Sequence, residues 1–199
     1  MRKAGEKPGR FAALSDDDIL SRTVGELTPL AQRVVIVDYD PHWPDLFQRE
    51  AEKIQAALGP RAMQIEHIGS TAVPGLAAKP VIDILLVVAD SACEEQYAAA
   101  LESIGYTLRI REPDWHEHRM FVAAQQPDRN LHVFSAGSAE IARLLLFRDW
   151  LRSNRADREL YQRTKLELAQ KDWKYVQNYA DAKTAVVEEI LGRASLHRE

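Results

Sequence analysis

The sequence predicts an α/β fold in which a mixed sheet flanked by helices is followed by a helical C-terminal part. Up to about residue 134, short β-branched segments alternate with segments whose apolar residues recur at helical spacing. After Gly137 the helical spacing continues alone. The 199 residues suit one domain, and no internal repeat divides them.

The elements of the first half follow from their apolar spacing and from the residues that end them. Residues 1–15 are charged and contain glycine, which predicts a loose lead, and Ser15 can cap a short helix after it. The β-branched "RVVIVDYD" at residues 33–40 predicts a strand that the following prolines end. An amphipathic helix is predicted from Asp45 to Leu58, with a Gly-Pro pair as its stop.

The remaining elements are predicted from the same patterns. Residues 63–68 and 81–88 are expected as strands, and a helix with Cys93 on its buried stripe follows and ends at Gly105. Three short strands and three helices complete the chain. The strands are expected at residues 106–110, 118–123 and 130–134, with a turn at 126–129 before the last, and the helices at about 138–153, 157–170 and 173–191.

Composition and charge exclude several classes of protein. A net charge of −4 lacks the basic excess of a general nucleic-acid binder. No apolar stretch approaches the roughly 20 residues that span a bilayer, and the first residues lack an apolar signal core, so we expect a cytoplasmic protein with no membrane partner. A single cysteine permits neither an internal disulfide nor a cysteine-built zinc site. None of these observations predicts the oligomeric state.

The first candidate functional residue is Asp83, the one acid within the apolar run at residues 81–88. An ionised carboxylate among apolar residues is costly unless it is paired, coordinated or placed at a cleft. Two interpretations stay open. In one, Asp83 accepts hydrogen bonds from a loop or pairs with an arginine. In the other, its strand delivers it to a pocket, where it holds a metal or a reacting hydroxyl.

A Gly-Ser-Thr turn stands about a dozen residues before Asp83. Gly69 lets the backbone approach an anion closely, and the hydroxyls of Ser70 and Thr71 can bind phosphate oxygens. Lys79 stands just before the strand that carries the aspartate. The alternative is an ordinary tight turn without a ligand.

Three histidines are expected on neighbouring strands, where they could face one pocket. His67 lies near the end of the strand before the turn, His118 opens a later strand beside Arg119, and His132 lies within the next strand. Neutral histidines suit phosphate binding or general-base work near pH 7. A lone strand histidine is otherwise a hydrogen-bonded core residue.

Two cations lie on predicted buried stripes of the C-terminal helices. Arg148 and Lys183 each stand in line with apolar residues at spacings of three and four. If both heads reach the cleft at Asp83, they could clamp a polyphosphate. Otherwise their stems lie along the core while the heads reach solvent, or one of them pairs with Asp83 in a structural ion pair.

Several motifs together resemble the GrpB family, an uncharacterised protein family. They are "DYDPHWPDLF", "EHIGSTAVPGLAAKPVIDILL", "HRMF", "NLHVF" and "LLLFRDWLR". The resemblance covers about residues 24–192, with a sheet part at about 33–134 and a helical part at about 138–192, and it leaves residues 1–23 as a flexible or partly helical lead. It implies a nucleotidyltransferase-like fold, and a related domain is fused to dephospho-coenzyme A kinase in some bacteria.

The resemblance also implies roles for single residues. In the wider superfamily, a Gly-Ser turn precedes a strand with two alternating acids that hold Mg²⁺. Gly69 and Ser70 match that turn, and Asp83 matches the first acid. Leu85 stands at the second acid, and His132 stands where a third would be sought. One aspartate with substrate phosphates could hold a single hydrated Mg²⁺ ion.

Three functions follow as hypotheses. The leading one is a nucleotidyltransferase-fold protein that binds a nucleotide or another phosphorylated small molecule and transfers a nucleotidyl or phosphoryl group. The second is a non-catalytic folding-accessory or interaction module, which Leu85 in place of an acid favours. The third is a metal hydrolase built on the three histidines. In the leading hypothesis Asp83 and His132 act in catalysis, Asp83 holds the metal, and phosphate is bound by His67, Gly69, Ser70, Thr71, Lys79, His118, Arg119, Arg148 and Lys183.

Overall fold

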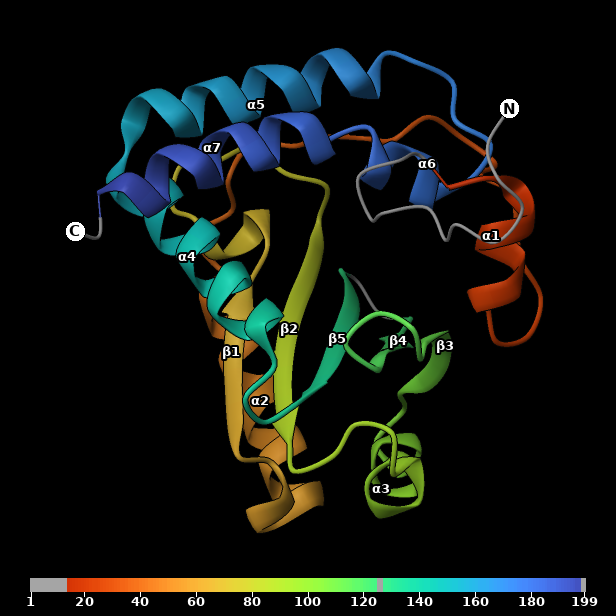
Figure 1. Cartoon of the computed structure of the whole chain (residues 1–199). Coiled ribbons are helices and arrows are strands. Elements are labelled where there is room, and N and C mark those ends of the chain that lie inside the picture. Colours follow the sequence, from red (N-terminus) through yellow and green to blue (C-terminus); the bar gives the residue numbers. More distant parts are fainter. Residues whose placement is uncertain (1–13, 125–126, 198–199) are drawn as a thin grey trace.

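The computed structural model describes residues 14–124 and 127–197. A five-stranded mixed sheet carries helices on both faces, which confirms the predicted fold class (Figure 1). Residues 1–13 of the predicted lead and Gln126 of the predicted turn lie outside the described residues. Within the described ranges, no helix has the length and the apolar character that crossing a bilayer needs.

The sheet has the strand order β1-β2-β5-β4-β3. β2 runs parallel to β5 and antiparallel to β1, and β4 is antiparallel to both of its neighbours. Each strand overlaps a predicted one. The bounds are β1 (Gln64–Ile68), β2 (Val81–Val88), β3 (Thr107–Glu112), β4 (His118–Ala123) and β5 (Asp128–Ser135).

The helices begin and end near the residues that the sequence indicates. Ser15 caps α1, since its hydroxyl accepts from the backbone N–H of Asp18 at 3.1 Å. The α-helices are α1 (Asp16–Arg22), α2 (Trp43–Leu58), α3 (Ala98–Ser103), α4 (Ala139–Ser153), α5 (Arg155–Ala169), α6 (Val176–Asp181) and α7 (Thr184–Leu196). The short 3₁₀ turns are η1 (Gly59–Arg61), η2 (Ser70–Ala72) and η3 (Glu94–Gln96).

Side chains of β2 alternate between two cores. Ile82, Ile84 and Leu86 belong to the core that includes α2 and α3, whereas Leu85 and Val87 pack on the opposite face under α4. Figure 1 shows α4 in front of β1 and β2 and α2 behind them. The same view shows α5 and α7 crossing the end of the sheet at which β2 begins. Asp83 lies on the α4 face at this end.

The predicted strand at residues 33–40 is wrong. Only Val37 makes a β-bridge, to Ala78, and Val35 is 60% exposed. Val34 instead packs with Leu168 of α5 and Tyr179 of α6. The segment is extended because it crosses the helical part of the molecule, and no strand lies beside it to complete a ladder.

Two predicted helices are interrupted. Cys93 does not lie on a buried helical stripe: it precedes η3, is half-buried, and donates its thiol hydrogen to Asp90 at 3.2 Å. The helix expected at 173–191 breaks before Lys183. The two halves pack in different places, because Tyr179 of α6 belongs to the cluster around Val34, whereas Ile190 of α7 packs with the α4 and α5 residues beneath it.

Candidate functional site

The Gly-Ser turn and Asp83 lie against each other. Ile68 pairs with Asp83 across β1 and β2, so the chain turns at Gly69 directly beside the carboxylate. Gly69 has φ +70°, and a Cβ atom there would lie 2.3 Å from Oδ2 of Asp83. Glycine alone combines this backbone conformation with this close approach. The turn and the acid therefore form one structural unit.

Asp83 is ionised and reachable from solvent. Its side chain is 27% exposed, Asn130 on the paired strand β5 donates to Oδ1 at 3.0 Å, and Nε2 of His132 lies 3.8 Å from the same oxygen. Loss of water would raise the pKa of the Asp83 carboxyl. The interactions with His132 and Asn130 and the charge of Lys183 outweigh that effect and lower the pKa. Within the described part of the chain, no arginine or lysine seals this carboxylate.

Lys165 of α5, for which the sequence analysis predicted no role, contacts the Gly-Ser turn through Ser70. The residue is 2% exposed, and its Nζ bonds to Oγ of Ser70 at 2.9 Å and to the carbonyl oxygen of Ala77 at 2.6 Å. Burial lowers the pKa of Lys165 to about 7, and the charge of Lys183 acts in the same direction. Its helical spacing with Tyr161 and Leu168 is a sequence pattern that indicates an inward-facing lysine.

Ser70 lies between these groups. Tyr161, one turn before Lys165, also interacts with the Ser70 hydroxyl, and burial raises the pKa of Tyr161 to about 12. Lys183 precedes α7 with its ammonium 4.7 Å from the ring centre of Tyr179, and its charge is felt at both Asp83 and Lys165. One half-buried hydroxyl, one carboxylate and two amines thus gather at the start of β2.

A chain of hydrogen bonds leads from His132 across the sheet. Nδ1 of His132 lies 3.1 Å from Nε2 of His118, and Nδ1 of His118 lies 2.7 Å from Oε2 of Glu112. Burial would raise the pKa of Glu112, but its bonds with His118 and Arg22 outweigh burial and lower it. An ionised carboxylate only accepts, so His118 carries its proton on Nδ1.

The tautomer of His118 determines the tautomer of His132. When His118 is neutral, its Nε2 accepts, so His132 must donate from Nδ1. Nε2 of a neutral His132 then carries no proton and lies 3.8 Å from Oδ1 of Asp83, so the lowering of the Asp83 pKa by His132 belongs to the protonated imidazole. The structure thus brings His132 to the predicted site and places His118 behind it.

His67 and Thr71 brace the turn from the opposite face of the sheet. His67 pairs with Ile84 in the sheet, its ring stacks on Phe47 of α2, and its Nε2 lies 3.1 Å from Oγ1 of Thr71. Thr71 donates to the carbonyl oxygen of Val81 at 3.0 Å. Burial lowers the pKa of His67 to about 4, so this histidine is neutral near pH 7. Neither side chain joins the group around Asp83.

Two predicted arginines also lie elsewhere. Arg119 is buried on the α2 face and bonds to Glu94 at 2.5 Å. Arg148 of α4 bonds to Glu66 at 2.7 Å and to its neighbour Asp149 at 2.8 Å, so it neither clamps the site nor pairs with Asp83.

Lys79 is half-buried before β2, and its Nζ forms no hydrogen bond or ion pair within residues 14–124 and 127–197. The predicted residues that do meet at the site are Gly69, Ser70, Asp83, His132 and Lys183.

A resident metal ion does not fit these donors. Among the residues that the structure describes, no three His, Cys, Asp or Glu side chains are grouped so that they could hold a metal. Leu85, where the resemblance would place a second acid, is fully buried in the cluster under α4. Mg²⁺ prefers several oxygen ligands in octahedral geometry, and Asp83 alone supplies too few.

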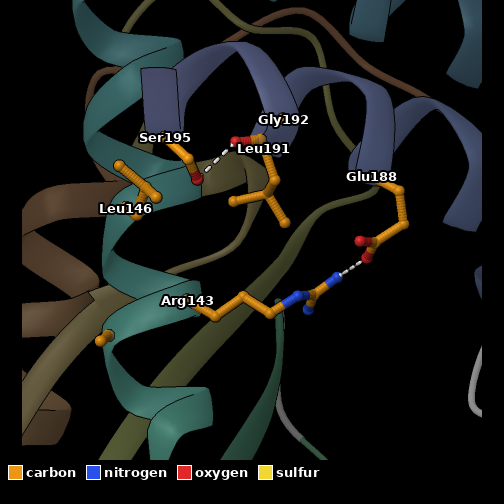
Figure 2. Close-up of a pocket in the computed structure, with 7 residues that line it drawn as sticks. Arg143, Leu146, Glu188, Leu191, Gly192 and Ser195 are labelled. Atoms are coloured by element: carbon orange, nitrogen blue, oxygen red, sulfur yellow. Dashed lines mark hydrogen bonds and ion pairs between the residues drawn. The ribbon is translucent and has the colours of Figure 1, made fainter. Parts of the chain in front are cut away.

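A separate pocket of about 390 Å³ lies between α4 and α7 (Figure 2). Arg143 points toward Glu188 across it, and the two form an ion pair, while Ser195 donates to the carbonyl oxygen of Leu191 at 2.9 Å. These three polar side chains are therefore engaged with other groups of the protein. None of the residues around Asp83 lines this pocket, so we place the candidate site at the Gly-Ser turn.

Comparisons with protein families, protein sequences and solved structures point to the same family. Residues 33–193 match the family model described as GrpB protein. A UPF0157 protein of Halalkalibacterium halodurans is 57% identical over 181 residues, which are 91% of this chain and 92% of that protein. The crystal structure of the conserved protein GrpB from Enterococcus faecalis has a TM-score of 0.73 and 31% identity, and the match covers 83% of this chain and 100% of that one. A dephospho-CoA kinase of Mycolicibacterium paratuberculosis is 33% identical over 143 residues, 59% of this chain and 35% of the kinase.

Proposed function

We propose that this chain, which belongs to the GrpB family, binds a nucleotide or another phosphorylated small molecule at the Gly-Ser turn. The observation that carries the proposal is the meeting of Asp83, Lys165 and Lys183 at the turn that carries the half-buried Ser70 hydroxyl. Two amines and a hydroxyl beside a tight glycine turn suit phosphate oxygens. Asp83 and His132 then face the part of the ligand that lies over β2 and β5.

Lys183 supplies the attraction for the anion. Its ammonium is half-buried beside Tyr179, and no carboxylate forms an ion pair with it among the described residues.

The reaction that we assign to the site is transfer of a nucleotidyl or phosphoryl group. His132 directs a lone pair toward the space beside Asp83, so it is the group that we expect to accept the proton of an acceptor hydroxyl. We propose Mg²⁺ only as an ion carried by the phosphates of the ligand, with Asp83 as its protein ligand. No step is assigned to a resident metal.

Isothermal titration calorimetry tests the binding proposal. Mg-ATP, Mg-GTP, Mg-CTP, Mg-UTP and dephospho-coenzyme A are titrated into the full chain, and at least one is expected to bind. Ser70→Ala and Lys183→Met should each weaken that binding about tenfold, the effect of one lost hydrogen bond to a charged group. Ser138→Ala, at the start of α4, is the control and should bind like the wild type. The proposal fails if none of the five ligands produces heat of binding.

A non-catalytic binding module is the second candidate. The observation that favours it is Leu85, which is sealed under α4 where an acid would be needed for two-metal chemistry. Incubation with α- and γ-labelled nucleotides separates the two candidates. Release or transfer of label that is lost in His132→Phe supports transfer, whereas tight binding with unchanged nucleotide supports the module.

A further inference from the structure

We propose that Ser70 is a nucleophile, that Lys165 is its base, and that the transferred group passes through a covalent intermediate on Ser70. This inference deepens the proposed function and rests on it for the substrate, a phosphate ester or anhydride whose phosphoryl or nucleotidyl group is moved. The nucleotide's first acceptor is then a side chain of the protein.

The hydrogen bonds of Lys165 suit a base. The carbonyl oxygen of Ala77 can only accept, so Nζ donates one hydrogen there at 2.6 Å. As an ammonium, Nζ also donates to Oγ of Ser70 at 2.9 Å, and once the amine is neutral its lone pair can accept the Ser70 proton across the same distance. A hydroxyl whose proton points at a neutral amine is the arrangement that activates a serine.

The surroundings favour the neutral amine. Lys165 is buried, no carboxylate forms an ion pair with it in the described part of the chain, and the charge of Lys183 also disfavours its ammonium form. The charge of Asp83 acts in the opposite direction, but loss of water and the charge of Lys183 outweigh it. The pKa of about 7 means that a large fraction of Lys165 is deprotonated at neutral pH.

The geometry is also fixed on a rigid element. Gln162, one turn before Lys165 on α5, accepts from the backbone N–H of Ala77 at 2.9 Å. Two side chains of one helix therefore hold both polar groups of Ala77, and they hold Lys165 in register with the turn. Ser70 itself is half-buried at the start of η2, whereas Lys165 is 2% exposed.

The first half-reaction balances without an external oxidant or reductant. Ser70 Oγ forms a bond to phosphorus, the bond from phosphorus to the leaving oxygen breaks, and the hydroxyl proton moves to Nζ of Lys165. The resulting ammonium keeps that proton, and the leaving oxygen departs as an anion. In the second half, the acceptor hydroxyl gives its proton to His132, its oxygen bonds to phosphorus, and Ser70 leaves as a hydroxyl after taking back the proton from Lys165. His132 then releases its proton to water.

A neutral fluorophosphonate probe tests the dyad without any nucleotide. The full chain is incubated with the probe, and the modified residue is identified by peptide mass spectrometry. Ser70 should gain the phosphonyl group with loss of fluoride, at a rate that rises with pH through about 7 as Lys165 loses its proton. Ser70→Ala should abolish this adduct, whereas Ser138→Ala, which lies outside the site beside His116, should leave it unchanged.

Two lysine variants test whether Lys165 is the base that activates Ser70. Lys165→Met keeps the length of the side chain and should slow labelling of Ser70 about a hundredfold. Lys183→Met removes the neighbouring charge, so the pH at which labelling is half-maximal should move upward. If Lys165→Met does not fold, the shift in Lys183→Met and a lysine Nζ titration near pH 7, followed by NMR of ¹³C-labelled wild-type chain, still decide the outcome.

Absence of a Ser70 adduct from about pH 6 to about pH 9 would overturn the inference, as would equal labelling of folded Lys165→Met and wild type. These results are distinguishable from failure of the proposed function. Labelling does not require nucleotide binding, and calorimetry does not require a nucleophile. A chain that binds nucleotide but leaves Ser70 unlabelled retains the binding site and loses the covalent step.

Discussion

Gly69 leaves no room for a side chain beside Asp83. Oδ2, Cβ and Cγ of the aspartate would lie 2.3, 2.9 and 3.0 Å from a Cβ atom on Gly69. The glycine at this turn therefore serves the acid as well as the backbone, because any side chain would displace the carboxylate from the space in front of the turn. The spacing of about a dozen residues in the sequence becomes direct contact in the fold.

Gly69→Ala should destabilise the protein by about 3 kcal/mol, since it combines a strained positive φ with a clash. Gly75→Ala is the matched control, because Gly75 has φ +76° and nothing within 4 Å of its Cβ position. That control should cost only about 1 kcal/mol. The free energy of unfolding is measured by denaturant titration. Equal costs for the two variants would contradict the contact between Gly69 and Asp83.

Motifs in the sequence mark the two halves of this unit, but they do not indicate which side chains contact it. "HIGST" and "VIDILL" place the turn and Asp83 by motif, and strand pairing brings them together. Arg148 was an equally good candidate by helical spacing, yet it bonds to Glu66. Lys165 has the same spacing, and its amine is the one that meets Ser70. Periodicity shows that a cation lies on an inward stripe, but the anion or hydroxyl that it meets depends on how the helices cross the sheet.

His67 should make the protein sensitive to mild acid. Its folded pKa of about 4 lies below the value of 6.5 for an exposed histidine, so between these values the unfolded chain binds a proton that the folded chain does not. Stability is therefore lost as pH falls from about 6.5 to about 4. His67→Gln preserves a partner for Thr71 and should reduce this loss by about 2 to 3 kcal/mol.

Denaturant titrations of both proteins at neutral and at acid pH provide the measurement for His67. His116→Gln is the control, because His116 is exposed. If the wild type and His67→Gln lose the same stability on acidification, the buried neutral state of His67 is wrong.

Lys165 should affect the stability of the protein above neutral pH, whereas His67 affects it in acid. Its folded pKa of about 7 lies below the ordinary value of 10.5, so the unfolded chain binds the extra proton between these values. The stability of the wild type relative to Lys165→Met should thus rise by about 1 to 2 kcal/mol from about pH 7 to about pH 9. Lys171→Met, at an exposed position, should show no such rise. Parallel profiles for Lys165→Met and the wild type would mean that Lys165 titrates normally.

The sheet was predicted more successfully than the segments that cross it. β2 and β4 match their predicted residues because apolar alternation and a flanking turn are local signals. Residues 33–40 have an equally strong β-branched pattern, yet their neighbours are helices. Lys183 likewise reaches the site only because α6 ends before it. Its position depends on packing around Tyr179, which spacing along a single helix cannot report.

His118 should set the tautomer of His132. In the wild type, when both histidines are neutral, His118 accepts from Nδ1 of His132, and Nε2 of His132 is unprotonated. His118→Phe removes that acceptor, so the proton of His132 should move to Nε2, where Asp83 can accept it. Two-bond ¹H–¹⁵N correlation spectra of the imidazoles distinguish the two forms directly. His118→Gln, whose amide oxygen can still accept, should restore the wild-type tautomer. A His132 that already carries its proton on Nε2 in the wild type would contradict the chain from Glu112 and remove His132 as the base for the acceptor hydroxyl.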